Sequence, residues 1–338
     1  MFGPCMDKIN VALIGYGLSG SVFHAPYISF LDQYHLKWIV SSKENEILSR
    51  YPNVLVTQDI QEVLNDKNID LVIITTPNSL HFSQAKLALE HHKHVLVEKP
   101  FVCSMKEGNQ LIELAKNQKK ILSVFHNRRY DGDFLTLKKY FKTNLLGEIV
   151  YFESHFDRFK PHVQEHNWRE NKKTEAGGVL FDLGPHMIDQ ALQLFGKPQK
   201  IISDVTKLRK KAQQDDYFHL IFQYPHLRCS LQSNSLAAKA GVRFLVHGTE
   251  GSLEICGIDP QEQQLKEAKL SISQIGEDSR SAIFYDKNGV HKAIPIEKGQ
   301  YQSFFSELAQ AISSNQEPPV SAIDSLLNIQ IIIDAINC

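Results

Sequence analysis

Two patterns of apolar and polar residues divide the chain, which has 338 residues. Over the first 125 residues, short runs of β-branched and other apolar residues alternate with segments whose apolar residues recur every three or four positions. This alternation is typical of parallel strands joined by crossover helices. Strands are predicted at residues 9–14, 36–40, 54–57, 71–75, 94–97 and 121–125, with helices at 79–90 and 106–117. We therefore expect residues 1–125 to form a doubly wound α/β domain with a parallel sheet.

The second pattern begins after residue 125 and predicts a different kind of sheet. Residues 147–159 alternate, with Val150, Phe152 and Phe156 on one face and polar residues on the other. Further strands are predicted at residues 200–205, 217–224, 228–234, 243–247 and 252–255. Because tight turns join several of them, these strands should pair antiparallel. Residues 126–338 are therefore expected to form an α+β domain with a large, mainly antiparallel open sheet.

Two helices are predicted near the end of the chain, at residues 302–313 and 326–336. Ser321 and Asp324 have the spacing of a capping box ahead of the second helix. We expect the C-terminal helix to pack back on the first domain.

The composition excludes several classes of partner. The 37 lysines and arginines are balanced by 38 acidic residues, so no basic surplus predicts binding to nucleic acid. The five cysteines lack the paired short spacing of a zinc site or a disulfide framework, which favours a reducing compartment. No apolar run approaches the roughly 20 residues that span a bilayer, and the N-terminus lacks the pattern of a secretory signal. We expect a cytoplasmic protein with neither a membrane nor a nucleic-acid partner.

A glycine-rich turn follows the first predicted strand, in the order Gly15, Tyr16, Gly17, Leu18, Ser19, Gly20. In a G-x-G-x-x-G loop the first glycine permits a tight turn, the second lets the backbone approach a pyrophosphate, and the third lets helix and strand pack closely. The following helix N-terminus supplies unpaired amides for the phosphates. Glycine triplets also occur in ordinary turns, but this one lies between a strand and a helix near the start of a βαβ series. It predicts a Rossmann dinucleotide-binding domain.

The end of the second predicted strand bears on the choice of dinucleotide. An acidic side chain there would bind the ribose diol of NAD and repel a phosphate. This chain has Ser41, Ser42 and Lys43 instead, two hydroxyls and an ammonium that suit a 2'-phosphate, and Glu44 comes one position late. Lys43 could also be a solvated loop charge. NADP is therefore the predicted cofactor, and NAD is the less favoured alternative.

Small polar residues follow the fourth predicted strand, where the crevice for a cofactor's ribose and nicotinamide lies in such folds. They are Thr75, Thr76, Pro77 and Asn78, and His81 stands near the start of the next helix. Asn78 or Ser79 could equally cap that helix, and the two roles are compatible.

Two further motifs resemble those of a known family. The first, at the end of the fifth predicted strand, is Glu98, Lys99, Pro100. The second is Gly-Gly-x-x-x-Asp-x-x-x-His, which runs from Gly177 to His186. With the glycine loop and the Thr-Thr-Pro-Asn segment, their order closely resembles the glucose-fructose oxidoreductase and inositol dehydrogenase family, often called Gfo/Idh/MocA. The resemblance covers essentially the whole chain, which looks most like the bacterial NADP-dependent scyllo-inositol dehydrogenases of that family.

The resemblance implies roles for these residues. Lys99 would point at the substrate hydroxyl beside the nicotinamide, Glu98 would lie at the cofactor, and the peptide before Pro100 is expected to be cis. Asp182 and His186 would contact the substrate, with His186 as the preferred base because its ordinary pKa lies near neutral pH. From the residues alone, Lys99 could be a surface lysine, His186 a structural partner and Asp182 a helix cap. Lys99 could also share the proton with His186.

Local pattern places the second motif at the start of a helix. Pro185 suits the first turn of a helix that Gly196 ends. This prediction puts His186 at the N-terminal end of the helix, with Asp182 one turn earlier or in the entering loop.

Other candidates come from the resemblance and from strand alternation. By resemblance, Asn127 and Arg128 approach the cofactor, although a salt bridge is an equally good role for Arg128. Trp168, followed by Arg169, resembles a recurrent pair of the family and is a candidate substrate contact.

His155 and Arg158 lie on opposite faces of their predicted strand, so only one faces the substrate unless a bulge intervenes, and His155 is preferred. The run from His91 to His94 does not predict a metal site, because adjacent histidines at a helix end point apart.

The combined prediction is an NADP(H)-dependent oxidoreductase that acts on a secondary alcohol of a cyclitol or sugar-like substrate, with scyllo-inositol as a candidate. One alternative keeps the fold and changes the substrate to another sugar or a dihydrodiol. The other is a dinucleotide-sensing regulatory protein without turnover, against which the set Lys99, Asp182 and His186 argues. By resemblance, the chain is expected to form a homodimer or homotetramer.

Overall fold

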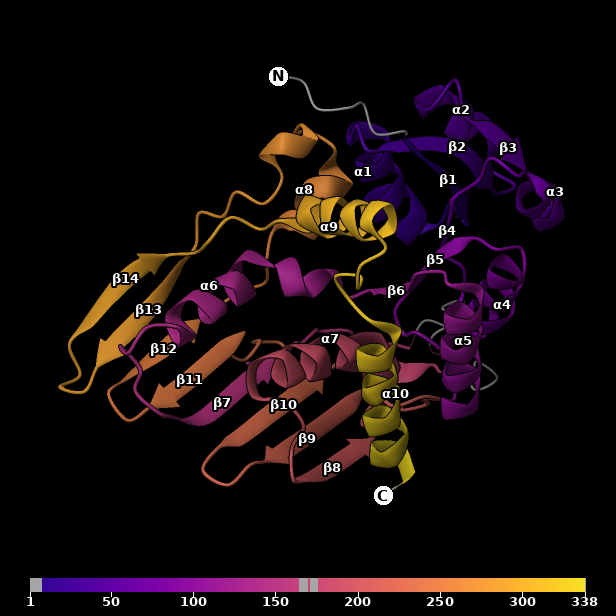
Figure 1. The fold of residues 1–338 in the computed structure, drawn as a ribbon. Helices are drawn as coiled ribbons and strands as arrows, with labels where there is room; N and C mark the ends of the chain where they lie inside the picture. Colours follow the sequence, from indigo (N-terminus) through magenta and orange to yellow (C-terminus); the bar gives the residue numbers. More distant parts are fainter. Residues whose placement is uncertain (1–7, 164–169, 171–175, 338) are drawn as a thin grey trace. The chain divides into compact units, whose positions relative to one another are not determined.

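The computed structural model describes residues 8–163, 170 and 176–337, which form two compact units (Figure 1). Unit 1 comprises the chain up to His126 together with Glu262–Ile275 and Tyr301–Leu326. Unit 2 comprises Asn127–Gln261, Gly276–Gln300 and the chain from Leu327. Two late segments, which a simple division near residue 125 assigns to the second domain, therefore cluster with the N-terminal residues.

Unit 1 contains a six-stranded parallel sheet in the order β3-β2-β1-β4-β5-β6. The strands are β1 (Ile9–Ile14), β2 (Tyr34–Val40), β3 (Leu55–Thr57), β4 (Leu71–Ile74), β5 (His94–Glu98) and β6 (Leu122–Phe125). β4 and β6 are buried along their whole length, and β5 along all but its first residue, because helices cover both faces of a sheet of this kind. The predicted doubly wound sheet is confirmed, and its order reverses between β1 and β4, where such folds bind ligands.

The helices of the N-terminal part of unit 1 separate these strands. They are α1 (Ala25–Phe30), α2 (Glu44–Arg50), α3 (Ile60–Asn65), α4 (His81–Glu90) and α5 (Met105–Gln118). A π-helical turn, Gly20–His24, precedes α1, and a 3-10 turn, Asn78–Leu80, precedes α4.

Helix α9 (Tyr301–Ser314) completes the core of unit 1. The ring of Phe304 lies 4.9 Å from that of Phe125, and the ring of Phe305 lies 5.4 Å from that of Tyr27. The Tyr34 hydroxyl also donates a 2.6 Å hydrogen bond to the Phe305 carbonyl. A helix far along the sequence is thus part of the first hydrophobic core.

Unit 2 contains an eight-stranded sheet in the order β14-β13-β12-β11-β7-β10-β9-β8. Its strands are β7 (Ile149–His155), β8 (Lys200–Thr206), β9 (Tyr217–Gln223), β10 (Arg228–Asn234), β11 (Phe244–Gly248), β12 (Gly251–Ile255), β13 (Ser281–Asp286) and β14 (His291–Pro295). Every pair is antiparallel except β7 with β10, which confirms the mainly antiparallel sheet. Val150, expected to share the buried face with Phe152, is 41% exposed near the start of β7.

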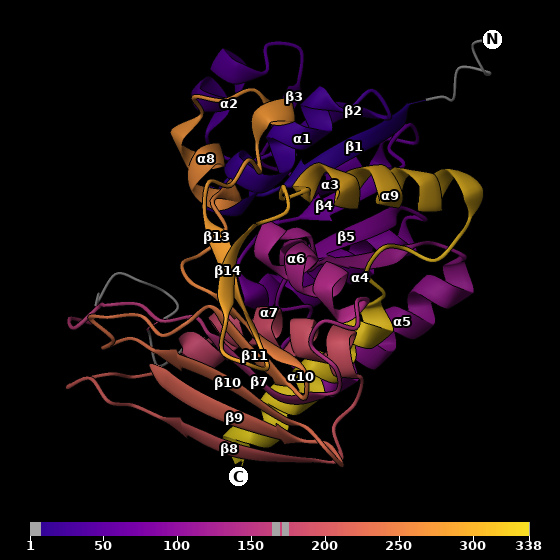
Figure 2. The ribbon, with the colours of Figure 1, turned by 90° about the vertical axis from the view of Figure 1, so that its left-hand side faces the viewer.

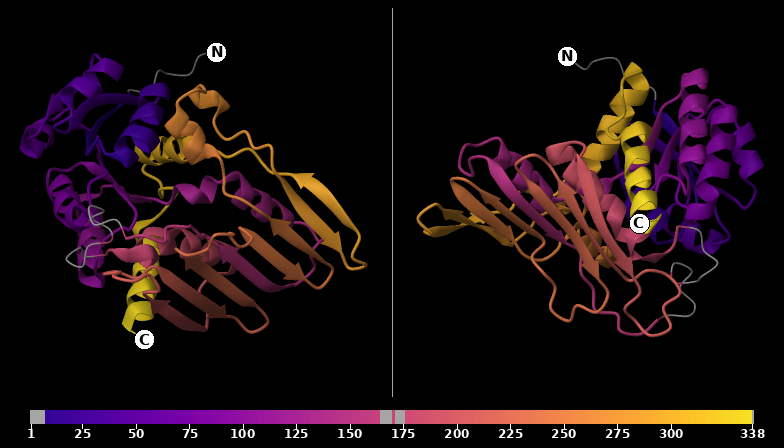
Figure 3. Two further views of the ribbon diagram at one scale, coloured as in Figure 1. Left: turned by 180° about the vertical axis from the view of Figure 1, so that it is seen from behind. Right: turned by 90° about the horizontal axis from the view of Figure 1, so that it is seen from below.

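Helices α6 (Gly132–Phe141) and α7 (Gly178–Phe195) cover one face of this sheet (Figure 2). The opposite face carries no helix in the described part of unit 2 (Figure 3). Two other helices, α8 (Gln261–Glu267) and α10 (Ala322–Asn337), each contain a junction between the units. Within the described ranges, no helix has the length and apolar character that a bilayer span requires.

The prediction that Pro185 begins its helix is wrong, because α7 begins seven residues earlier. The Asp215 carboxylate accepts a 2.7 Å hydrogen bond from the Leu180 amide, and the Asp215 carbonyl accepts one from the Val179 amide. These contacts satisfy amides that the first turn of a helix leaves unpaired. A cap from outside the helix therefore extends it, and Pro185 lies inside it.

Candidate functional site

The glycine loop at the carboxyl end of β1 is packed against Thr75 at the end of β4. The Thr75 hydroxyl lies 2.8 Å from the Gly15 carbonyl and 3.1 Å from the Ile14 carbonyl, to which it can donate. Gly15 has a φ of +95°, and a Cβ added at Gly20 would lie 2.3 Å from the Gly15 carbonyl oxygen. A side chain at Gly17 would meet nothing within 4 Å. The loop thus needs its first and third glycines for packing, while the second faces open space that fits a phosphate group.

Glu98 connects this loop to the end of β5. Its carboxylate accepts hydrogen bonds from the Ser19 hydroxyl and, at 2.8 Å, from His24 Nε2. The Lys99 amide donates to the same carboxylate at 3.1 Å, and the Lys99-Pro100 peptide is cis, as expected. Glu98 thereby brings the glycine loop and the backbone of Lys99 together at one edge of the sheet.

The Glu98 carboxylate is held in its ionised form. Burial alone would raise the pKa of Glu98, but the hydrogen bond and charge of His24, the Ser19 hydroxyl and the charge of Lys99 together lower this pKa. An anion at this point pairs with His24, whose ring centre lies 4.4 Å from that of Phe125 at an interplanar angle of 51°.

The segment after β4 is braced by a buried histidine. His81 is fully buried, with Nδ1 2.8 Å from the Pro100 carbonyl oxygen and Nε2 3.0 Å from that of Thr76. Burial lowers the pKa of His81, which favours a neutral ring that donates to one of these carbonyls. The cap positions are occupied by Pro77 and Leu80, so neither Asn78 nor Ser79 is an N-cap.

The segment after β2 presents the predicted hydroxyls and ammonium. Ser41 pairs through its amide with the Thr57 carbonyl, and its hydroxyl accepts a 3.2 Å hydrogen bond from the Lys43 amide. The Lys43 ammonium lies 3.2 Å from the Glu46 carboxylate, and both side chains are about half exposed. Ser42 is exposed beside them.

A second cation, Arg50, lies near the glycine loop and was not predicted. Burial raises the pKa of Tyr16 in the glycine loop, and the Arg50 guanidinium partly offsets that effect. Arg50 is the last residue of α2, whose N-cap is Lys43, and no helix was predicted over these residues.

In unit 2, Asp182 and His186 lie one turn apart on α7, on the same side of the helix. His186 is buried, with 6% of its surface exposed. The Asp182 carboxylate accepts a 3.0 Å hydrogen bond from Arg158. A cation therefore contacts the second motif, although His155 was the preferred candidate of the two. The helix itself therefore brings these two predicted residues together.

His155, the last residue of β7, belongs to a different cluster, with acidic residues on either side of it in the sequence. Its Nε2 lies 2.7 Å from a Glu153 oxygen, and its Nδ1 lies 3.2 Å from an Asp157 oxygen. The hydrogen bond with Asp157, assisted by Glu153, raises the pKa of His155 although burial opposes the shift. His155 thus contacts one carboxylate of β7 and one just after it, while Arg158, three residues beyond the strand, contacts Asp182.

Asn127 and Arg128 are buried in a 3-10 turn, Asn127–Tyr130. Arg128 lies 3.1 Å from the Asp131 carboxylate and 4.7 Å from the centre of the Phe156 ring. The salt bridge considered for Arg128 is therefore present. Trp168 and Arg169 lie outside the described residues.

Comparisons with known proteins agree with this fold. The sequence profile of the oxidoreductase family's NAD-binding Rossmann fold matches residues 9–126, and that of its C-terminal alpha/beta domain matches residues 138–337. The uncharacterised oxidoreductase YdgJ of Escherichia coli is 42% identical over 96% of this chain and 95% of its own. The NADP(+)-dependent scyllo-inositol 2-dehydrogenase IolW of Bacillus subtilis is 37% identical over 97% of this chain and 92% of its own.

Solved structures show the same architecture. The oxidoreductase YPO2259 of Yersinia pestis superposes with a TM-score of 0.93 at 39% identity, covering 99% of this chain and 96% of that one. The chain belongs to the Gfo/Idh/MocA family of oxidoreductases. It is a dehydrogenase with a nicotinamide-dinucleotide-binding Rossmann domain.

Proposed function

We propose that the chain transfers a hydride between the nicotinamide of NADP(H) and a secondary alcohol of a cyclitol or sugar-like substrate, with scyllo-inositol as the first candidate. The observation that carries the proposal is the contact of Glu98 with both Ser19 and the Lys99 amide. It links a phosphate-binding loop to a lysine at the same edge of the sheet. Support for the substrate class comes from IolW and from the D-glucoside 3-dehydrogenase of Escherichia coli, 28% identical over 57% of this chain.

In the proposed chemistry, Lys99 and His186 have different roles. Bound NADP⁺ would supply the hydride acceptor. A carbinol carbon releases hydride only as its hydroxyl loses a proton, so a base is needed within hydrogen-bond reach and a donor must stabilise the developing alkoxide. We assign the base to His186 Nε2 or Nδ1 and the donor to the Lys99 ammonium. Asp182, held by Arg158, would orient a substrate hydroxyl.

The preference for NADP follows from the residues after β2. Ser41, Ser42 and Lys43 offer hydrogen-bond donors, and no carboxylate occupies the first three positions after the strand. Arg50 adds a further cation near Tyr16. This donor set suits the dianionic 2'-phosphate better than a ribose diol.

The decisive experiment combines a substrate panel with two variants. Purified protein is incubated with NADP⁺ and a set of inositols and sugars, and NADPH formation is followed by absorbance. For the substrate that turns over, Lys99→Met and His186→Asn should each lower kcat by roughly 10²- to 10⁴-fold. NADPH affinity, measured by fluorescence, should change little, since neither side chain is assigned to the phosphates.

Lys106→Met, an exposed lysine on α5, is the matched control and should leave kcat unchanged. If NADPH binds tightly but no polyol or sugar is oxidised, the regulatory alternative replaces this proposal. If Lys99→Met turns over normally, the assigned role of Lys99 is wrong.

We also propose that the chain associates into a homodimer or homotetramer through the face of the unit 2 sheet opposite α7. On that face Ile202 is 45% exposed and lies opposite Ile221 in the β8–β9 pairing. Sedimentation velocity should show a species larger than the 38.5 kDa chain. Ile202→Asp should shift it towards the monomer, whereas Val290→Asp, in the β13–β14 turn, should not.

A further inference from the structure

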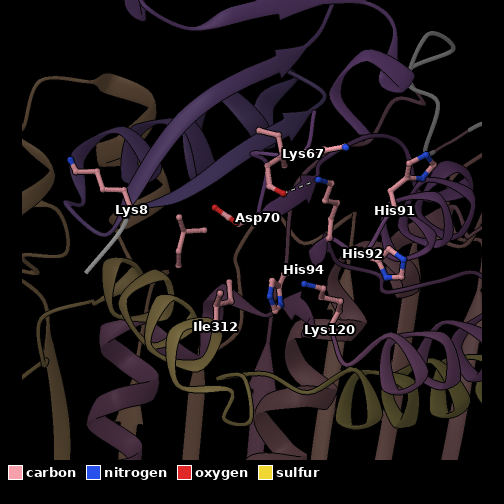
Figure 4. A pocket seen from close by; sticks show the side chains of 11 residues that line it. Lys8, Lys67, Asp70, His91, His92, His94, Lys120 and Ile312 are labelled. Carbon is pink, nitrogen blue, oxygen red and sulfur yellow. Dashed lines mark hydrogen bonds between the residues drawn. The ribbon is translucent and has the colours of Figure 1, made fainter. Parts of the chain in front are cut away.

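A basic pocket lies at the amino ends of the parallel strands in unit 1 (Figure 4). Its volume is about 460 Å³, within the range of small-molecule sites. The loops before β1, β4, β5 and β6 form it, with Ile312 of α9. The glycine loop follows the carboxyl end of β1, so the pocket lies at the opposite edge of the same sheet.

The charges that line the pocket are strongly unbalanced. The lining includes three histidines and four lysines, which are Lys8, Lys67, Lys93 and Lys120. Among the described residues of the lining, Asp70 is the one acidic residue, and its carboxylate already accepts a 2.8 Å hydrogen bond from the Asn10 amide. A surplus of cations in a concave site raises the local concentration of anions.

Of the four lysines, Lys93 has hydrogen-bond acceptors within the protein. Helix and loop carbonyls gather at this edge of a parallel sheet, and the Lys93 ammonium donates to the carbonyls of Asp66 and Ile69 at 2.8 and 2.9 Å (the latter dashed in Figure 4). Within the described residues, the ammonium groups of Lys67 and Lys120 have no hydrogen-bond or ion-pair partner. Unlike the Lys93 ammonium, these two ammonium groups are therefore not neutralised or hydrogen-bonded by backbone carbonyls of the described residues.

His94 adds a neutral donor at the first position of β5. Its Nδ1 accepts a 3.0 Å hydrogen bond from the Ile121 amide, which leaves the ring proton on Nε2. Burial, assisted by the Lys120 charge, lowers the pKa of His94 to about 4, so the ring keeps this single-proton form at neutral pH. Figure 4 shows the Lys120 ammonium beside the His94 ring.

We propose that this pocket binds a small anion with two or more negative charges, such as a phosphate ester or a polycarboxylate. Within the described residues, the ammonium groups of Lys67 and Lys120 and the Nε2–H of His94 are donors without a compensating acceptor. Charge-assisted hydrogen bonds from ammonium groups to anionic oxygens are the strong ones. The site is separate from the dinucleotide loop and does not depend on which alcohol the enzyme oxidises.

The test is calorimetry on protein saturated with NADPH, so that the glycine loop is occupied. Pyrophosphate and citrate are titrated separately, and inorganic phosphate serves as a smaller probe. One binding event per chain is expected for at least one of the two larger anions, and the preferred anion distinguishes a phosphate ester from a polycarboxylate. Absence of binding by both at concentrations up to about 10 mM would overturn the proposal.

Three variants locate the site. Lys67→Gln/Lys120→Gln should weaken binding at least about tenfold, because two unpaired charges are lost. Lys106→Gln/Lys116→Gln removes the same charge from α5 outside the pocket and should leave the affinity within about twofold. Asp70→Asn should tighten binding, since it removes the acidic residue of the lining. Equal weakening in both lysine pairs, or no effect of Asp70→Asn, would show general electrostatic attraction and overturn the assignment.

Discussion

Glu98 acts through three neighbours at once. Its carboxylate receives hydrogen bonds from Ser19 and His24, at the two ends of the π-helical turn after β1, and from the Lys99 amide after β5. A buried anion is tolerated only when it is paired and hydrogen-bonded. The sequence motif identifies Glu98 by position, but only the three-dimensional contacts show that it fixes the lysine relative to the glycine loop.

The choice between dinucleotides can be tested at one position. Ser41→Asp places a carboxylate directly after β2, where it should repel a 2'-phosphate. The Kd for NADP⁺ should rise at least about tenfold while the Kd for NAD⁺ falls or stays constant, as measured by fluorescence titration. Asn109→Asp, exposed on α5, adds the same charge elsewhere and should change neither constant. Unchanged NADP⁺ affinity in Ser41→Asp would mean that the phosphate lies elsewhere.

Side-chain partners were the least predictable part of the site. The glycine loop, Lys99, Asp182 and His186 stand out as motifs in the sequence. Arg158 did not, because alternation along the strand predicted at residues 147–159 indicates only that it faces away from His155. It cannot show that Arg158 contacts the helix that carries Asp182. Local periodicity carries no information on contacts between distant segments.

Among the helices, α7 depends on a residue outside it for its first turn. Asp215 reaches the amides of that turn, and a Cβ at Gly178 would lie 2.0 Å from the Asp215 carboxylate, so glycine is required there. Pro185 and Gly196 are the residues of this segment that predict a helix start and a helix end. The hydrogen bonds from Asp215 nevertheless allow the helix to begin before Pro185. This is why the helix end was predicted correctly and its start was not.

The cap makes stability depend on pH. Burial raises the pKa of Asp215 from 3.8 to about 6 in the folded chain, although amide hydrogen bonds oppose the shift. The folded state therefore binds the proton more tightly, and the stabilisation from this group is greatest below pH 3.8 and is lost as the pH rises to about 6. In urea unfolding, the stability of the wild type relative to Asp215→Asn should fall by about 3 kcal/mol over that interval.

Asp32→Asn, at an exposed aspartate before β2, serves as the control for this pH series. The pH series of Asp215→Asn is compared with that of this variant, measured in the same buffers. A constant difference from the wild type for Asp215→Asn would mean that the carboxyl does not titrate in this range.

Buried strands were predicted from the sequence, whereas exposed strands at the edge of the second sheet were not. β4 and β6 are buried throughout and β5 nearly so, and all read as continuous apolar runs. β13 and β14 were not predicted, because β14 buries a single residue, Ile294, and its other positions are exposed and polar or small. An edge hairpin of this kind differs little from a loop in its pattern.

Unit 1 is discontinuous in sequence, and its core depends on α9. Phe305 is fully buried against Tyr27, His24 and Phe125. Phe305→Ala should lower the free energy of unfolding by about 3–5 kcal/mol, measured by urea denaturation. Phe30→Ala, half exposed on α1, should have a much smaller effect. Similar losses in the two variants would show that α9 contributes little to this core.

This arrangement also sets an order of events during protein synthesis. The first 126 residues leave the ribosome with their strands and crossover helices, but Phe304 and Phe305 follow about 175 residues later. At roughly 5–20 residues per second, that interval lasts about 9–35 s. Until then the nascent N-terminal segment exposes the apolar patch around Phe125, which makes it a natural client for chaperones.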